Sequence, residues 1–177
     1  MIDIARATID DALLLADLST VTFIQTYSET CSGEDMVAFL DAHFDVNILK
    51  EDVYDKENYY FIAYVDDIPA GFIRFRKEYV ALDSTLTGVI NLKSIYVLHE
   101  YQNQKVGASL IEFTIQFAKQ ENISTVTLSV WENNNKAIAF YKRFQFIDSG
   151  KRTLFLIGKT AQRDHIMMKD VLCHITT

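Results

Sequence analysis

The chain has 177 residues, of which 49% are hydrophobic and 23% are charged, and its formal net charge is -7. This length fits one domain with a hydrophobic core, over residues 1–177. The negative charge argues against a nucleic-acid partner and favours neutral or cationic small molecules. It also has a simpler explanation, since a net charge keeps a protein soluble.

Nothing in the sequence indicates a targeting signal, a membrane span or a metal site. Residues 1–11 lack the basic start and apolar core of a signal peptide, and no apolar run approaches the roughly 20 residues that span a bilayer. We therefore expect a cytoplasmic protein. Cys31 and Cys173 share no motif, which favours idle or buried thiols. The histidines show no ligand spacing, so no zinc site is expected. They are His43, His99, His165 and His174.

The first half of the chain predicts a strand, two longer helices and a shorter one. Residues 2–7 alternate like a short strand. Thr8 or Asp10 then caps a helix to about Tyr27. Residues 32–44 begin with a capping serine, and a shorter helical stretch follows through Ile48 and Val53. The inner faces of the two longer helices are expected to carry Leu14, Leu18, Val21 and Phe23 in the first and Met36, Phe39, Leu40 and Phe44 in the second.

The second half predicts the rest of a sheet. Residues 59–65 and 72–80 indicate a hairpin around the turn at 66–71, and residues 89–98 form another strand. A helix follows whose inner face carries Val106, Leu110, Thr114, Phe117 and Ala118. Residues 124–131 are a β-branched strand, residues 133–144 a short helix, and residues 146–158 and 163–172 two closing strands. The order predicts a mixed α/β or α+β fold, with helices packed on one sheet.

The stretch HEYQNQKVGAS, residues 99–109, connects a strand to a helix and has the composition of an anion site. A helix N-terminus offers unpaired N–H groups and a partial positive charge. Gln102, Asn103 and Gln104 add neutral donors, Lys105 adds a positive charge, and Gly107 permits close approach of a ligand. The stretch matches neither G-x-x-x-x-G-K-[ST] nor G-x-G-x-x-G. The alternative is a plain β–α connection with one capping glycine.

The short helix at 133–144 carries a second group of polar residues. Asn134, Ala137 and Tyr141 are three and four residues apart and so share one face. From there Tyr141 can point its hydroxyl toward the ligand of the loop. The alternative is a core aromatic residue whose hydroxyl reaches water.

Together these motifs resemble the Gcn5-related N-acetyltransferase (GNAT) superfamily. The resemblance follows the element order of the whole chain and is strongest in LKSIYVLHEY, the glutamine- and glycine-containing loop after it, and NNKAIAFYKRFQF. Within the family the chain is most similar to PaiA-type spermidine/spermine N-acetyltransferases, through TFIQTYSE, EDMVAFLDAHF, VWENNNKAIAFYKRF and DHIMMKDVL. The resemblance implies a central mixed, mostly antiparallel sheet with a splayed strand pair, flanked by helices.

The resemblance also implies acetyl-CoA as cosubstrate, no metal, and a set of binding residues. The strand at Ile95, Tyr96 and Val97 would pair with the pantetheine arm. Asn134 would hydrogen-bond the cofactor, and Arg143 would reach its nucleotide end. The loop and helix start that would receive the pyrophosphate are Gln102, Asn103, Gln104, Lys105, Val106, Gly107, Ala108 and Ser109.

The implied chemistry is direct attack of a neutral amine on the thioester. A strand N–H near Tyr96 or Val97 would stabilise the oxyanion, and Tyr141 would donate a proton to the leaving thiolate as general acid. Many relatives offer a glutamate as base on the strand before the loop, whereas this chain has Asn91, Lys93 and Ser94 there. Water relayed by backbone carbonyls is the favoured substitute, with Glu29 or another N-terminal acid as the alternative.

Two further departures from the family concern glycines. Lys105 occupies the place of the usual first glycine of the loop, where a helical conformation would suit a lysine. Gln145 replaces a glycine before the closing strands, where we expect a small local change.

The acceptor would lie beside the first helices, where acidic side chains can attract a polyamine. The residues there are Tyr27, Glu29, Glu34, Asp35, Asp41 and Asp45. Each acid alone is also explained as part of a solvated helix surface. Other acceptors are a peptide N-terminus, an amino acid or an aminoglycoside-like amine, and a different class of function is an acyl-CoA sensor without turnover. A homodimer is possible, with residues 163–172 pairing across subunits.

Overall fold

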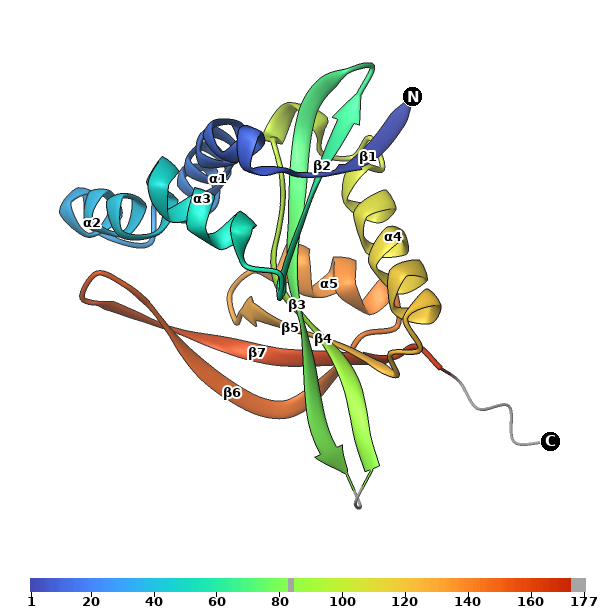
Figure 1. Cartoon of the computed structure of the whole chain (residues 1–177). Coiled ribbons are helices and arrows are strands. Elements are labelled where there is room, and N and C mark those ends of the chain that lie inside the picture. The colour runs from blue at the N-terminus through green and yellow to red at the C-terminus, as the bar shows by residue number, and fades with distance from the viewer. Residues whose placement is uncertain (83–84, 173–177) are drawn as a thin grey trace. The chain divides into compact units, whose positions relative to one another are not determined.

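The structure is a computed structural model that describes residues 1–82 and 85–172 (Figure 1). Cys173 and His174 lie outside these residues. The elements in chain order are β1 (Ile2–Arg6), the 3-10 turn η1 (Ile9–Asp11), α1 (Ala12–Tyr27), α2 (Gly33–Phe44), α3 (Val46–Tyr54), β2 (Asn58–Val65), β3 (Ile68–Leu82), β4 (Thr85–Val97), the 3-10 turn η2 (His99–Tyr101), α4 (Val106–Gln120), β5 (Thr125–Trp131), α5 (Asn135–Arg143), β6 (Ile147–Ile157) and β7 (Thr160–Asp170).

The described strands form one mixed sheet in the order β1-β2-β3-β4-β5-β7-β6. β1 pairs with β2 and β5 pairs with β7 in antiparallel fashion, whereas β4 and β5 are parallel. This confirms the predicted mixed, mostly antiparallel sheet flanked by helices. β7 lies between β5 and β6, so residues 163–172 are not available to pair across subunits, as the suggested homodimer would require.

The chain divides into two compact units that are interleaved along the sequence. The first unit consists of Met1–Arg74, Ser94–Leu110 and Leu156–Ala161. The second consists of Phe75–Lys93, Ile111–Phe155 and the chain from Gln162 on. Because β3, β4 and α4 each contribute to both units, neither unit is a continuous segment. That residues 1–177 act as one domain stays a prediction.

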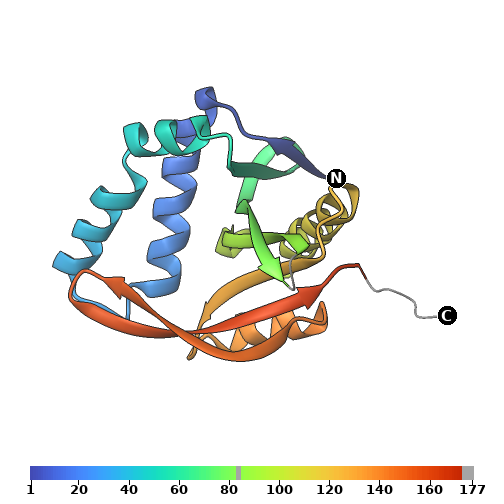
Figure 2. The same cartoon turned by 60° about the horizontal axis from the view of Figure 1, so that its bottom comes forward.

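In the first unit α1 packs against α2 and α3, which appear in blue and cyan in Figure 2. Between α1 and α2 the rings of Phe23 and Phe39 stack, with centroids 4.3 Å apart. Leu18 is buried as predicted, but the prediction for Val21 is wrong, since that side chain is 43% exposed.

The reason lies in the small and polar residues on the inner face of α1. Ser19 and Thr22 are buried there, together with Leu15. The Thr22 hydroxyl donates to the Leu18 carbonyl oxygen at 2.6 Å, so its burial leaves no unsatisfied donor. A pattern based on apolar residues alone assigns such positions to solvent.

The hairpin of β2 and β3 closes through Asp66 and Asp67. Their φ angles of 48° and 65° place both in the left-handed region that a two-residue type I′ turn needs. This confirms the predicted hairpin.

The turn between β6 and β7 binds the first turn of α2. Asp35 accepts hydrogen bonds from the Lys159 backbone N–H at 3.0 Å and from the Thr160 hydroxyl at 3.3 Å. Gly158 has a φ of +57°, and a Cβ there would lie 2.0 Å from an Asp35 carboxylate oxygen. The turn therefore needs both the glycine and the carboxylate.

We expect Asp35→Ala to lower the melting temperature at pH 7 more than Asp41→Ala, an exposed carboxylate on the same helix. The hydrogen bond from the Lys159 N–H, followed by those from Ser32 and Thr160, lowers the pKa of Asp35. A lowered pKa contributes stability above the usual value of about 3.9, and this stability is lost as the pH falls through the folded-state pKa. The difference between the variants should therefore shrink below about pH 4, as thermal unfolding at several pH values will show; an equal effect of both substitutions at pH 7 would contradict it.

Candidate functional site

The end of β4 lies against a glycine of β3. The Leu98 N–H donates to the Ala70 carbonyl oxygen at 3.0 Å. A Cβ on Gly71 would lie 2.4 Å from the Tyr96 carbonyl oxygen and 3.0 Å from the Val97 Cα. Real side chains do not approach a backbone so closely, so Gly71 sets the path of β4 at Tyr96 and Val97. Sequence reasoning missed this role, because an isolated glycine within a strand only hints at a close approach.

The loop after β4 is held by its own side-chain amides. Gln102 donates from Nε2 to the Val97 carbonyl oxygen at 3.2 Å, and Gln104 donates from Nε2 to the Glu100 carbonyl oxygen at 2.7 Å. Each of these groups has a second N–H. The glutamines therefore fix the shape of the loop and join it to the end of β4. Asn103, between them, is exposed and has a φ of 64°.

Lys105 turns the chain into α4 with a φ of +68°. The expectation of a helical conformation at this position is thus wrong, because the lysine keeps the left-handed geometry of the glycine that it replaces. Such a conformation is disfavoured by about 1 kcal/mol for a residue with a Cβ. Its side chain is exposed.

The first turn of α4 presents backbone donors. The Ser109 N–H donates to the Lys105 carbonyl oxygen at 2.9 Å and begins the helical ladder. The N–H groups of Val106, Gly107 and Ala108 come before it and have no carbonyl four residues back within the helix. Among the described residues this turn has no carboxylate. It therefore has the electrostatics of an anion site.

α5 carries the predicted polar pair in the second unit. Asn134 caps the helix, since its side-chain Oδ1 accepts the Ala137 N–H at 3.0 Å. Tyr141 is buried at 6% exposure, and its ring packs edge-on against Phe140 and Phe146. The packed ring is compatible with Tyr141 as a general acid and with Tyr141 as a core aromatic residue. The two interpretations differ only in the role of the hydroxyl group.

The end of α5 carries Arg143 and the corner at Gln145. The Arg143 guanidinium lies 5.6 Å from the centroid of the Phe140 ring, and its side chain is exposed. Gln145 has a φ of 67°, so it too adopts a left-handed conformation in place of a glycine. Its Oε1 accepts a hydrogen bond from Lys169 at 3.1 Å.

One face of the sheet in the second unit, the polar face, carries Asn91, Thr127 and Asp164 together with the apolar side chains of Trp131, Ile166 and Met168. The registers place Asn91 beside Thr127 and Trp131 beside Asp164. Because successive strand residues point to opposite faces, the other face carries the buried residues Ile90, Leu92, Val126, Leu128 and Val130. On the polar face the Asn91 amide donates to Glu78 Oε1 at 3.0 Å, and Lys93 Nζ lies 3.5 Å from the same oxygen.

Asp164 is the least usual residue of this face. It is only 9% exposed, and its buried Oδ1 has no hydrogen-bond partner among residues 1–82 and 85–172. Burial, and then the charge of Glu132, raise the pKa of Asp164 to about 6, while His165 opposes them. The sequence gives one indication that Asp164 is unusual, namely a carboxylate within a predicted closing strand.

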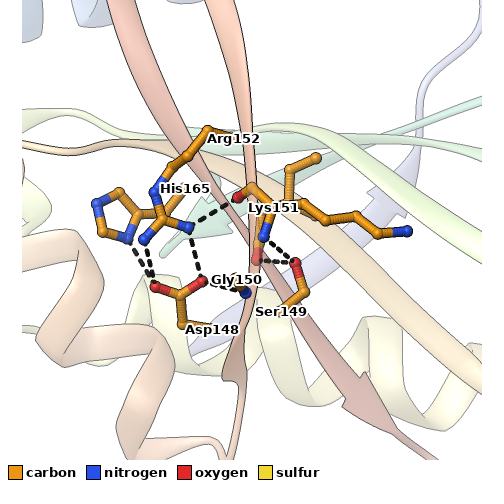
Figure 3. A network of polar contacts seen from close by, with 7 residues as sticks. Asp148, Ser149, Gly150, Lys151, Arg152 and His165 are labelled. Carbon is orange, nitrogen blue, oxygen red and sulfur yellow. Dashed lines mark hydrogen bonds and ion pairs between the residues drawn. The ribbon is translucent and has the colours of Figure 1, made fainter.

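His165 points to the other face and belongs to a different network. Figure 3 shows that its Nδ1 and the Arg152 guanidinium both approach Asp148, at 2.9 Å. The Arg152 bond, the Gly150 N–H and His165 lower the pKa of Asp148. Of these contacts the one between His165 and Asp148 joins β7 to β6, whereas those of Arg152 and Gly150 lie within β6. The hydrogen-bond partner of His165 is thus Asp148 and not Asp164.

The acidic residues of the first helices divide into two kinds. Asp35 holds the β6–β7 turn, and Asp45 caps α3 by accepting the Asn47 N–H at 2.8 Å. Glu29, Glu34 and Asp41 are exposed.

Cys31, between α1 and α2, is a free, half-buried thiol. Burial and the charge of Asp35 raise its pKa, which keeps it protonated and unreactive.

The described residues hold neither a metal-binding cluster nor a helix suited to a bilayer. Residues 1–82 and 85–172 contain no group of three or more histidine, cysteine or acidic side chains placed to hold a metal ion. Within the same residues no helix is both long and apolar enough to span a bilayer.

The predicted cofactor residues fall into two groups. Ile95, Tyr96, Val97 and the stretch 102–109 belong to the first unit, where the Gln102–Val97 bond joins them. Asn134, Tyr141 and Arg143 belong to the second unit, on and beside α5.

Comparison with known proteins identifies the family. The model of the acetyltransferase (GNAT) family matches residues 21–146. A protein of Lactobacillus delbrueckii subsp. lactis, named as an uncharacterized N-acetyltransferase in the pepI 3′ region, is 24% identical over 86% of this chain and 87% of its own length.

Solved structures share the fold. The PaiA N-acetyltransferase of Thermoplasma acidophilum, in complex with coenzyme A, has a TM-score of 0.78 and 20% identity over 96% of this chain and 99% of its own. Arabidopsis thaliana NAA60, in complex with a bisubstrate analogue, has a TM-score of 0.72 and 14% identity over 96% and 99%. The chain belongs to the GNAT family and is an acetyl-CoA-dependent N-acetyltransferase.

Proposed function

We propose that the chain transfers the acetyl group of acetyl-CoA to a primary amine of a polyamine, with Tyr141 as general acid. The observation that carries the proposal is the first turn of α4, where the N–H groups of Val106, Gly107 and Ala108 precede the helical ladder and no described carboxylate competes for them. A diphosphate is the anion that such a turn suits.

The proposed cofactor site follows from this turn. Val106, Gly107, Ala108 and Ser109 receive the diphosphate, and the loop residues Gln102, Asn103, Gln104 and Lys105 surround it. Ile95, Tyr96 and Val97 pair with the pantetheine arm. In support, the recorded pairs of β4 with β5 end at Leu92, whereas β4 continues to Val97. Asn134 and Arg143 contact the cofactor from α5.

The proposed reaction needs no covalent enzyme intermediate. The amine nitrogen attacks the thioester carbonyl, the carbon–nitrogen bond forms and the carbon–sulfur bond breaks. An N–H of Tyr96 or Val97 stabilises the oxyanion. Tyr141 gives its proton to the leaving thiolate as general acid, and the proton that the nitrogen loses as the amide forms restores the phenol.

A polyamine is the acceptor that charge supports best. The net charge is -7, and Glu29, Glu34 and Asp41 are exposed on or beside the first helices. Such a surface attracts a multivalent cation and steers it by diffusion. The resemblance to PaiA-type enzymes points to the same acceptor.

Thiol release from acetyl-CoA with a panel of amines tests the function. We expect release with spermidine or spermine, and a decline of this turnover as ionic strength rises, because salt screens the attraction. A neutral amine that exceeds the polyamines would overturn the choice of acceptor. Binding of acetyl-CoA without release with any amine would overturn catalysis and leave a sensor.

Tyr141→Phe tests the general acid while keeping the ring packing. We expect turnover to fall by about a hundredfold, with the affinity for acetyl-CoA unchanged, in steady-state kinetics and direct binding. Tyr54→Phe, at an 80% exposed tyrosine, is the control and should behave as wild type. An unchanged rate in Tyr141→Phe would remove the hydroxyl from the mechanism.

Gly71→Ala tests the path of β4. The added methyl would collide with the Tyr96 carbonyl, so we expect the KM for acetyl-CoA to rise by about tenfold or more, equivalent to about 1.4 kcal/mol. Gly33→Ala is the matched control, since a Cβ there has no atom within 4 Å. Equal cofactor affinity in the two folded variants would show that this segment of β4 does not bind pantetheine.

A further inference from the structure

The structure assigns Asp164 a role in the reaction: it binds the ammonium group of the acceptor and takes its proton. This inference rests on the proposed function and supplies the base that the strand at Asn91 lacks.

Strand pairing places Asp164 beside the end of β5. β7 pairs with β5 so that Asp164 lies opposite Trp131, the last residue of β5. Asn91 on β4 and Thr127 on β5 share this face. The chain after Trp131 passes through Glu132 to Asn134 and α5, which carries Tyr141. The carboxylate thus belongs to the same unit as Tyr141, and it lies on β7 beside the end of β5, the strand that leads to α5.

The Oδ1 oxygen of Asp164 is unsatisfied among the described residues. The Asp164 side chain is 9% exposed and its Oδ1 is buried. A buried carboxylate oxygen without a hydrogen bond is unfavourable, unless a ligand donates one to it. Glu132 adds negative charge, and its backbone N–H, at 2.9 Å from the Arg163 carbonyl oxygen, fixes the turn beside Asp164. Two neighbouring carboxylates and an empty acceptor atom favour a cation that donates hydrogen bonds. A primary ammonium is such a group, because it carries a positive charge and donates hydrogen bonds.

Burial and then the charged neighbours set the pKa of Asp164. Burial and Glu132 raise its pKa from 3.8 to about 6, and His165 opposes them. His165 itself is turned to Asp148 on the opposite face (Figure 3). The raised pKa makes the carboxylate about a hundredfold more basic than an ordinary aspartate, while it remains ionised at pH 7.

The proton transfer balances without another reactant. The ammonium nitrogen loses one proton to Asp164 Oδ1, which gives a neutral amine and a neutral carboxylic acid. The freed electron pair on nitrogen is then available for attack on the thioester.

Glu78 is the competing carboxylate of this face. The Asn91 amide and Lys93 already contact its Oε1, so its charge is partly compensated. By contrast, no group in the described part of the chain hydrogen-bonds to Asp164 Oδ1, and therefore we favour Asp164.

Asp164→Asn in the full-length protein tests the role, with Asp170→Asn, an exposed carboxylate on the same strand, as matched control. We expect kcat/KM for the amine to fall about a hundredfold in Asp164→Asn, with wild-type affinity for acetyl-CoA. The rise of kcat/KM through about pH 6 should disappear. Asp170→Asn should change neither quantity by more than about twofold.

Direct binding gives a readout besides activity. Titration of spermidine into the coenzyme A complex should show affinity about tenfold weaker in Asp164→Asn than in Asp170→Asn, because a neutral amide attracts an ammonium less strongly. A raised pKa contributes stability below the unfolded value, and this stability is lost as the pH rises through about 6. Asp164→Asn should therefore melt no lower than wild type at pH 7.

The outcomes separate this inference from the proposed function. If wild type releases no thiol with any amine, the proposed function fails. If wild type is active and Asp164→Asn matches Asp170→Asn in amine kinetics and spermidine binding, only the inference fails. Loss of activity in Glu78→Gln with Asp164→Asn unaffected would also overturn it. So would a less stable Asp164→Asn whose folded fraction turns over amine at the wild-type rate.

Discussion

Backbone N–H groups at the start of α4 are the feature on which the proposed function depends. Three of them precede the helical ladder, and the chain reaches them through Lys105 in a left-handed conformation. Gln102 and Gln104 use side-chain amides to hold the loop to Val97 and Glu100. Conformational strain at one residue is thus offset by hydrogen bonds around it, which keeps the donors preorganised for an anion.

The proposed amine chemistry depends on a different constraint, the burial of charge. In the second unit one face of the sheet is apolar and packed, whereas the other carries Asn91, Thr127 and Asp164. In the strand order β7 is next to β5, so Asp164 on β7 lies beside the end of β5, the strand that leads into α5. A buried carboxylate beside Glu132 opposes folding at neutral pH. A residue that lowers the stability of the fold in this way is expected in a site where a bound ligand neutralises its charge.

Local patterns predicted the elements well because each has a local cause. Ser32 caps α2, Asp66 and Asp67 close the hairpin, and the apolar face of α4 is buried at Val106 and Leu110. Long-range effects escaped prediction. The burial of Asp164, the contact of Gly71 with Tyr96 and the bond from Asp35 to the β6–β7 turn join residues far apart in sequence. The left-handed geometry of Lys105 escaped too, because a lysine gives no signal of it.

Calorimetric titration of the purified protein with coenzyme A, and in parallel with pantetheine, tests most directly whether the amides of the α4 turn bind a diphosphate. The account predicts a measurable heat of binding for coenzyme A and an affinity for pantetheine that is weaker by more than about tenfold, since hydrogen bonds to charged groups contribute about 1.5–3 kcal/mol each. No heat with coenzyme A, or equal affinity for the two compounds, would contradict it.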